Sequence, residues 1–479
     1  MPSRVVHVRP AEDGVAADSL RQGISRIQAE MKVSTEFPAS VEEAAARAAA
    51  SPRLPELDRT DIPFVTIDPA TAMDLDQALH IERDGEGFVV HYAIADLAAF
   101  ITPGDPVDLE AHRRGETLYG ADSKIPLHPK AISEGAGSLL PDQVRPALLW
   151  TIKLDKAGAQ TSATVERALV RSTARWSYVD AQAALEKGDA PEVIALLKEV
   201  GQLREQQEVA RGGVSLPLPE QEIEATDGSF SLAFREQLPV EMWNAQISLL
   251  TGMAAAGIMV AGKVGMLRTL PKPDPRDVDR LRLVAKALRI DWPADQDYPA
   301  FIRGLDPKTP AHQAMTVACT RLLRGSGYAA FDGELPAQRE QAAIAAEYAH
   351  VTAPLRRLGD RYALECCVAL CAEQPVPEWV TAALPDLPRT LEASAHRSHS
   401  YERALMDLIE AGILADRVGQ SFDGTVTSVD DKEPTHGVLM VSEVGVEATI
   451  TGSSLPLGQD VKARLAVADI EQRKVEFQL

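Results

Sequence analysis

Residues 64–81 read FVTIDPATAMDLDQALHI, and this stretch decides both the fold and the candidate chemistry. The segment FVTID is apolar and rich in β-branched residues, which predicts a buried strand that ends at Asp68. A loop with Asp74 and Asp76 follows, and their i, i+2 spacing points both side chains the same way on an extended chain. Catalytic groups often lie where a strand passes into a loop. The three acids are therefore our first candidate for a functional site.

Carboxylates this close together repel one another, and each raises the pKa of its neighbours unless a cation compensates. Oxygen ligands at this density suit Mg²⁺ or Mn²⁺ better than Zn²⁺. Such an ion would lower the pKa of a bound water molecule and stabilise a phosphoryl oxygen. The alternative is a solvated acidic turn without a ligand, and spacing alone leaves both interpretations open.

A second informative segment, EYAHVTAPLRRLGDRYALECC (residues 347–367), places Arg356 and Arg357 near the start of an apolar helix. The free N–H groups and the positive dipole end of a helix N-terminus favour anions. Two adjacent guanidinium groups can hold successive phosphates or stabilise charge that develops on one of them. An ordinary pair of surface charges is the alternative.

Composition limits the class of protein. The chain has 479 residues, 45% hydrophobic and 25% charged, as in globular proteins. We find no run of 18 apolar uncharged residues and no signal-like N-terminus, so we expect no membrane span and no secretion. The net charge of −21 argues against a surface coated in basic charge, but a buried channel can still be basic because exposed charges are screened beyond about 8–10 Å.

The four cysteines form no C-x-x-C pair. We expect them to be small buried residues in a reducing cytoplasm. They are Cys319, Cys366, Cys367 and Cys371.

The pattern along the chain predicts an α+β protein. Residues 1–60 are mainly helical and are expected to form a small N-terminal module. Residues 61–416 begin with strand-like segments and become mostly helical from about residue 178, which suggests one large catalytic domain. Residues 417–479 contain five short β segments separated by turns, which fit a barrel of the OB type.

Together, the two segments resemble the ribonuclease II family, whose catalytic module is the RNB domain. The family motif is Asp, five residues, Asp, one residue, Asp-Asp. Asp68, Asp74 and Asp76 match its first three acids, and Gln77 stands in the fourth place. Similar stretches follow in the family's order at residues 91–120, 125–148 and 349–363, and the last barrel resembles an S1-type RNA-binding domain. The resemblance covers about residues 60–479.

The resemblance implies a processive hydrolase that shortens single-stranded RNA from the 3′ end and releases nucleoside 5′-monophosphates. It implies that Mg²⁺, or Mn²⁺, binds at the acids and at Gln77, and that Asp76 and Arg356 are catalytic. The residues expected to contact RNA are Tyr119 by stacking on bases, Arg357 at a backbone phosphate, Glu402 at a ribose, and Thr352.

Gln77 departs from the family pattern. An amide oxygen can ligate a hard ion, but the substitution removes one negative charge, which predicts a weaker second metal position. The alternative function is a non-catalytic RNA-binding or regulatory relative of the same family, with Gln77 as a sign of lost activity. The retained acids and Arg356 argue against that alternative. We expect a cytoplasmic monomer whose partner is single-stranded RNA, with no membrane association.

The last barrel has little positive charge for a nucleic-acid binder. From Gly419 onward there are ten acids and five bases, and the aromatic residues are Phe422 and Phe477. We expect both rings to lie in the core and the barrel to guide RNA over a limited face.

Overall fold

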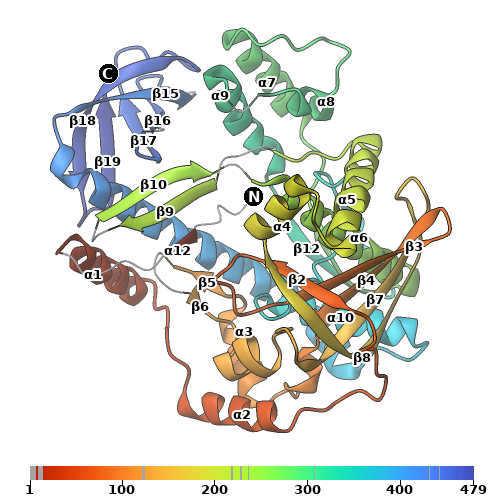
Figure 1. The fold of residues 1–479 in the computed structure, drawn as a ribbon. Helices are drawn as coiled ribbons and strands as arrows, with labels where there is room; N and C mark the ends of the chain where they lie inside the picture. The colour runs from red at the N-terminus through yellow and green to blue at the C-terminus, as the bar shows by residue number, and fades with distance from the viewer. Residues whose placement is uncertain are drawn as a thin grey trace.

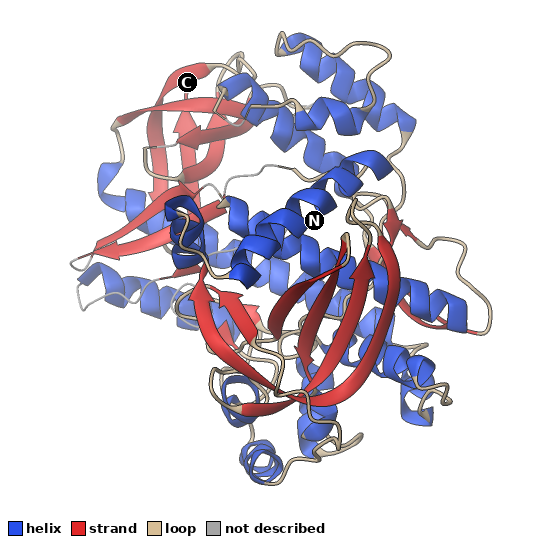
Figure 2. Cartoon of the chain, turned by 45° about the vertical axis from the view of Figure 1, so that its right-hand side comes forward, coloured by secondary structure: helices blue, strands red, loops and turns tan. Residues whose placement is uncertain are grey.

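The computed structural model describes residues 7–8, 15–120, 124–216, 220–226, 229–235, 237–306, 308–430, 432–441 and 443–479. In this part of the chain, two closed five-stranded barrels lie at opposite ends of the molecule, with helices between and around them (Figure 1). Figure 2 shows the same arrangement as two groups of strands joined through a helical centre. The predicted α+β class and the C-terminal five-stranded barrel are confirmed.

The first barrel has the strand order β2-β3-β4-β7-β8, and it closes because β2 pairs in parallel with β8. Its strands are β2 (Phe64–Asp68), β3 (Gln77–Asp84), β4 (Gly87–Ala95), β7 (Val144–Leu154) and β8 (Gln160–Ser177). The predicted strands at FVTID, at FVVHYAIAD and at ALLWTIKLD are confirmed as β2, β4 and β7. Strands β3 and β8 were not predicted.

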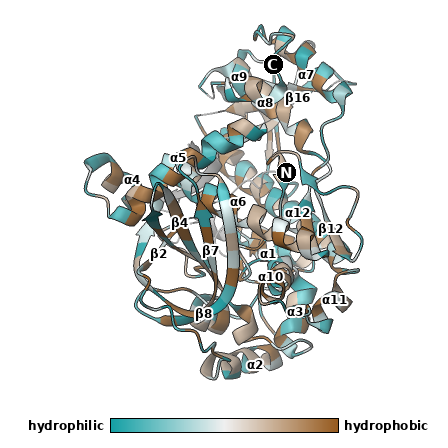
Figure 3. Ribbon diagram, turned by 90° about the vertical axis from the view of Figure 1, so that its right-hand side faces the viewer, coloured by the Kyte–Doolittle hydropathy of each residue, from teal (hydrophilic) through white to brown (hydrophobic). Residues whose placement is uncertain are grey.

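Strand β4 shows why this barrel is stable, because all nine of its residues are buried. Phe88, Val90, Tyr92 and Ile94 alternate along the strand and join the large core that also contains residues of α5, α6 and α10. Ala93 faces the other way, toward Phe64 and Leu149. Strand β8 is partly exposed and appears largely hydrophilic in Figure 3, which explains why hydrophobic patterning did not reveal it.

Helices cover this barrel and connect it to the second one. They are α3 (Pro106–Arg114), η2 (Ala131–Ala136), α4 (Tyr178–Lys187), α5 (Glu192–Arg211), α6 (Pro239–Gly262), α7 (Pro275–Ala287), α8 (Tyr298–Arg303), α9 (Pro310–Cys319), α10 (Leu358–Cys371), α11 (Glu378–Ala383) and α12 (Leu387–Leu414). Short strands also pair: β5 (Leu118–Tyr119) with β6 (Lys124–Ile125), β11 (Val264–Thr269) with β12 (Gly327–Asp332), β13 (Glu340–Gln341) with β14 (Ala346–Glu347), and β9 (Glu220–Thr226) with β10 (Ser229–Arg235) and β1 (His7–Val8).

Among the described residues, α6 is the one helix long and apolar enough to cross a membrane, and 50% of the relevant window is buried inside the protein. Residues 242–262 carry no charged side chain, although Asn244 and Gln246 interrupt the apolar run. The helix packs against α5, α10 and β11. A helix that is hydrophobic on most sides also fits the core of a large protein, so the expected absence of membrane association stays a prediction.

The C-terminal barrel consists of β15 (Ser421–Val429), β16 (His436–Val441), β17 (Val446–Thr451), β18 (Asp460–Asp469) and β19 (Lys474–Gln478). It closes in the order β15-β16-β17-β19-β18, and β17 pairs in parallel with β19. The prediction that its two aromatic residues lie in the core is confirmed: Phe422 is 4% exposed and Phe477 is fully buried. Their ring centroids lie 5.8 Å apart in an edge-to-face contact.

The N-terminal helices do not build a core of their own. Helix α1 (Val15–Glu30) packs on α12 and shares the core of the C-terminal barrel through Leu20, Ile24 and Ile27. Helix α2 (Ala39–Ala50) instead joins a cluster around Phe100, beside α3 and η2. The expected N-terminal module is therefore two separate packing elements, because each helix buries its apolar face against a different part of the chain.

The shared core predicts a clear effect of Phe477→Ala. The change leaves a cavity between the barrel strands, and truncating a buried Phe costs about 3–5 kcal/mol of unfolding free energy. We expect the urea midpoint of the transition followed by circular dichroism to fall. Val418→Ala is the control, because that side chain is 51% exposed and should shift stability by less than about 0.5 kcal/mol. Equal midpoints for both variants would contradict the packing described here.

Candidate active site

The loop between β2 and β3 carries the acids and is held from both sides. The Leu75 N–H donates to Ser138 Oγ at 2.9 Å, and Ser138 Oγ donates to the Met73 carbonyl at 2.7 Å. The Ala95 N–H at the end of β4 donates to the Asp76 carbonyl at 2.9 Å. These bonds fix the backbone of Asp74 and Asp76 between strand β4 and the segment after η2.

The acids are not a solvated turn. Asp76 is 5% exposed, the Asp74 side chain is 13% exposed, and Oδ2 of Asp68 is buried without a hydrogen-bond partner among the described residues. Burying a carboxylate is costly unless it is paired or coordinates a metal. The structure therefore removes the solvated-turn alternative.

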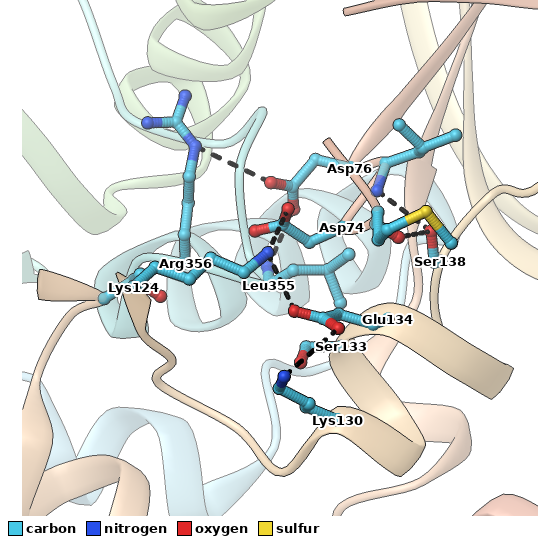
Figure 4. A network of polar contacts seen from close by, with 12 residues as sticks. Asp74, Asp76, Lys124, Lys130, Ser133, Glu134, Ser138, Leu355 and Arg356 are labelled. Atoms are coloured by element: carbon cyan, nitrogen blue, oxygen red, sulfur yellow. Dashed lines mark hydrogen bonds and ion pairs between the residues drawn. The ribbon is translucent and has the colours of Figure 1, made fainter. Parts of the chain in front are cut away.

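Asp76 lies against the arginine segment, although the two are far apart in sequence. The Leu355 N–H donates to Asp76 Oδ1 at 2.7 Å, and Arg356 Nε lies 3.7 Å from Asp76 Oδ2. Figure 4 shows the Asp76 carboxylate between the Leu355 backbone and the Arg356 side chain. Burial raises the pKa of Asp76 well above its usual range, and the Arg356 charge and the Leu355 hydrogen bond oppose that rise.

Asp68 is the second acid of the site, and it is partly buried with its Oδ2 atom enclosed. Burial raises its pKa to about 7, with the Arg356 charge acting against the rise and the Asp74 charge adding to it. An unpartnered buried oxygen and an elevated carboxyl pKa indicate a site that lacks positive charge. Asp68 and Asp76 therefore fit a hard divalent cation by their donor chemistry.

Asp74 is turned toward a lysine instead. Lys124 Nζ lies 2.6 Å from Asp74 Oδ1 and 3.0 Å from Glu134 Oε1. In the described residues, no group of three or more His, Cys, Asp or Glu side chains is already arranged to hold a metal.

Both the oxygen and the nitrogen of the Gln77 side-chain amide form hydrogen bonds. Its Oε1 accepts from the Tyr92 hydroxyl at 2.5 Å, and its Nε2 donates to the Thr352 carbonyl at 2.6 Å. The side chain thus connects strands β3 and β4 to the segment that precedes the arginines. Its expected role as a metal ligand stays a prediction, and the structure adds a positioning role.

Buried Asp360 organises the double arginine. Its Oδ2 accepts from the Ala353 N–H and from Arg357 Nη2, both at 2.8 Å. The helix α10 predicted after the arginines is confirmed, with Arg357 at its N-cap position. The Arg356 side chain is 41% exposed, whereas that of Arg357 is 22% exposed. Arg356 is therefore free to meet a ligand while it also faces Asp76.

The other expected RNA contacts differ in position. Tyr119 is 36% exposed; burial raises its pKa, and Arg356 and Asp74 are among the charges that act on it. This places Tyr119 beside the acid site. Thr352 is 3% exposed, and its hydroxyl is hydrogen-bonded with Ser248 at 2.8 Å, so it is not presented to a ligand in this structure.

Glu402 lies on α12. Burial raises its pKa to about 7, the Ser398 hydrogen bond lowers it, and the Glu116 charge raises it further. Glu116 in turn interacts electrostatically with Arg357. Glu402 therefore belongs to the arginine side of the site and not to the acid cluster.

Three residues that the sequence analysis did not single out adjoin the site. They are Lys124 at Asp74, Glu116 near Arg357 and Tyr178, whose hydroxyl is influenced by Asp68. Glu116 lies within the stretch 91–120 and Lys124 directly before the stretch 125–148, both of which carried the family resemblance, but a single residue has no spacing pattern. Only the folded chain brings them to the acids and arginines.

Comparison with known families agrees with this geometry. The profile of the RNB domain matches residues 57–370, and the profile of the RNase II-type exonuclease C-terminal S1 domain matches residues 420–479.

The four cysteines have the burial that was predicted for them, since three are buried and Cys371 is partly buried.

Individual relatives extend the comparison. Ribonuclease R of Escherichia coli is 26% identical over 88% of this chain, and the chain spans 57% of that protein's length. The structure of Mycoplasma genitalium RNase R in complex with ribose methylated single-stranded RNA superposes with a TM-score of 0.85 at 19% identity, over 96% of this chain and 78% of the other. Yeast Ssd1, a pseudonuclease, superposes with a TM-score of 0.69 at 15% identity, over 93% of this chain and 57% of the other.

The elevated pKa of Asp68 predicts pH-dependent stability without divalent metal. A carboxyl with a raised folded-state pKa gives stability that is complete below its ordinary pKa of 3.8 and is lost as pH rises to about 7. In EDTA, wild type should therefore melt progressively lower than Asp68→Asn from pH 4 to pH 7. Added Mn²⁺ at pH 8 should raise the wild-type melting temperature more than that of Asp68→Asn. A constant difference between the two proteins across this range would contradict the buried, cation-deficient site.

Proposed function

The chain belongs to the ribonuclease II family by its RNB domain, and from this membership and its buried acid site we propose that it is a 3′→5′ exoribonuclease. It hydrolyses single-stranded RNA processively to nucleoside 5′-monophosphates and depends on Mg²⁺. Its partner is RNA, and it acts as a cytoplasmic monomer.

One observation carries the proposal: a partly exposed guanidinium, Arg356, lies 3.7 Å from the buried carboxylate of Asp76, which adjoins the partly buried acids Asp68 and Asp74. Hydrolysis of a phosphodiester requires stabilisation of negative charge on the phosphoryl oxygens. Asp68 and Asp76 would hold the metal ion, which when bound supplies a Lewis acid and an activated water molecule. Arg356 binds the phosphoryl oxygens from the other side, and the Leu355 N–H keeps the Asp76 carboxylate oriented toward that centre.

RNA is bound next to this centre by groups without base preference. The exposed ring of Tyr119 stacks on a base, which contributes about 1–3 kcal/mol for any sequence. Arg357, fixed by Asp360, attracts a backbone phosphate. Glu402 contacts a ribose near the 3′ end. Relatives named Ribonuclease R, one of them solved with single-stranded RNA, support this assignment.

A non-catalytic function is the second candidate, because a structural neighbour is a pseudonuclease and Gln77 replaces an acid of the family motif. The enclosed carboxylate oxygens of Asp68 and Asp76 argue for catalysis. Without a cation, two carboxyl groups whose pKa is raised in the folded protein destabilise the folded state, and a metal bound for hydrolysis would offset that cost.

Asp76→Asn tests the catalytic assignment. The change keeps an oxygen that accepts the Leu355 hydrogen bond but removes the charge that the metal and Arg356 require. We expect release of nucleotides from a 5′-labelled RNA homopolymer to fall by at least about 100-fold, the range seen when a charge-stabilising group is lost, while RNA affinity stays within a few-fold of wild type.

The matched control is Asp84→Asn on β3, whose side chain is 52% exposed and pairs with Lys153. It should retain wild-type activity. If wild-type protein releases no nucleotides while it binds the same RNA, the non-catalytic alternative replaces the present proposal.

Glu402 predicts pH-dependent RNA affinity. Its carboxyl has a pKa of about 7, so it is neutral below pH 7 and negative above it. The negative charge repels RNA phosphates, and affinity measured in the Asp76→Asn background should fall as pH rises from 6 to 8. Glu402→Gln in that background should bind RNA with a smaller loss of affinity across the range, the remainder coming from Asp68, whose pKa is also about 7, and should bind more tightly than Glu402 at pH 8. The same pH profile with and without Glu402→Gln would show that this residue does not approach the RNA.

A further inference from the structure

The acid centre contains an ammonium group from the chain itself. Lys124 Nζ lies 2.6 Å from Asp74 Oδ1, and the Lys124 side chain is 23% exposed. The same nitrogen lies 3.0 Å from Glu134 Oε1, whose side chain is 18% exposed. Figure 4 places Asp74, Lys124 and Glu134 in one network beside Asp76. Lys124 is thus held by two carboxylates in a partly buried position.

The backbone around Lys124 keeps it there. Strand β6 pairs with β5, and Lys124 lies directly opposite Tyr119 in that pair. Glu134 belongs to η2, and Ser138 just after η2 fixes the loop between Asp74 and Asp76. The lysine, its two carboxylate partners and the acid loop are therefore connected through one set of short contacts.

The lysine ammonium group forms two ion pairs in this position, with Asp74 Oδ1 at 2.6 Å and Glu134 Oε1 at 3.0 Å. A charged ammonium group repels any cation brought close to it, and a divalent ion is repelled twice as strongly as a monovalent one. A metal ion at Asp74 would have to displace Lys124 from its partner.

The lack of charge at Gln77 also disfavours a second metal ion beside Asp74. Gln77 contributes no charge, and its amide oxygen already accepts from the Tyr92 hydroxyl at 2.5 Å. A second metal ion next to Asp74 would thus meet a carboxylate that is already paired with a lysine, and an amide without charge. Asp68 and Asp76, in contrast, form no ion pair with a lysine in the described part of the chain: Asp68 has a buried oxygen without a hydrogen-bond partner, and Asp76 lies against Arg356.

We propose that the Lys124 ammonium group takes the place of a second divalent cation at Asp74, so that the centre binds a single divalent ion through Asp68 and Asp76. Lys124 is a positioning residue: it neutralises Asp74 and holds it away from the metal. The inference rests on the proposed function in that it assigns a metal to these acids. It goes further because it fixes the number of ions and names the residue that sets it.

The stoichiometry of Mn²⁺ binding tests the proposal. Mn²⁺ is titrated into the full-length, metal-free protein without RNA, and binding is followed by isothermal calorimetry and by the electron paramagnetic resonance signal of the free ion. Wild type should bind one ion. Lys124→Gln, which keeps a hydrogen-bond donor but no charge, should bind a second ion at least tenfold more tightly than wild type does.

Two variants serve as controls. Lys124→Arg keeps the positive charge and should bind one ion. Lys130→Gln removes the other lysine near Glu134, which lies 3.9 Å from that carboxylate and is 73% exposed, and it should also bind one ion. Thermal melting shows that each variant is folded, and Lys124→Met replaces Lys124→Gln if the latter is not.

Some results would overturn the proposal. Two ions of similar affinity in wild type, none in wild type, or one ion in a folded Lys124→Gln or Lys124→Met protein would each do so. The readout is binding and not hydrolysis. A change from one ion to two in a protein that releases no nucleotides would therefore support this inference while the proposed activity fails.

Discussion

Carboxylates that are buried side by side lower the stability of a protein unless positive charge is brought to them. This constraint organises the centre of the molecule. Asp76 is 5% exposed, and its charge is met by the Leu355 N–H and by Arg356. Asp74 is met by Lys124. Asp68 retains a buried oxygen without a hydrogen-bond partner among the described residues, so two of the three acids have a close positively charged partner and the third has none in direct contact.

The fold supplies these compensating groups from separate elements. The acids come from the connection of two barrel strands, the arginines from the residues before α10, and the lysine from the hairpin β5–β6. The Thr117 N–H donates to the Arg356 carbonyl at 3.0 Å, and the Leu358 N–H donates to the Gly115 carbonyl at 3.0 Å. The segment after α3 therefore carries both the arginine backbone and the hairpin that presents Tyr119 and Lys124. Displacement of this segment would move three parts of the site together.

The sequence was sufficient where a pattern is local. The strand that ends at Asp68, the helix after Arg357 and the five strands of the last barrel follow from apolar periodicity and turn residues. It was insufficient where a partner is distant. Nothing near Gln77 in the sequence indicates that its amide bridges Tyr92 and the Thr352 carbonyl. Helix α1 likewise buries its apolar face on α12 and the C-terminal barrel, a partner that spacing within residues 1–60 does not reveal.

Gln77 and Lys124 have a common electrostatic consequence. Relative to a motif of four acids, Gln77 removes one negative charge, and Lys124 adds one positive charge at Asp74. Each change weakens the attraction for a second divalent ion, and neither touches the pair Asp68 and Asp76. Arg356, with 41% of its side chain exposed, still supplies positive charge on the opposite side of Asp76. A single metal ion and a guanidinium can then act on the two sides of one phosphoryl group. On the proposal made above, the loss of the fourth acid is compatible with hydrolysis, because Lys124 and Arg356 place positive charge of the protein's own beside Asp74 and Asp76.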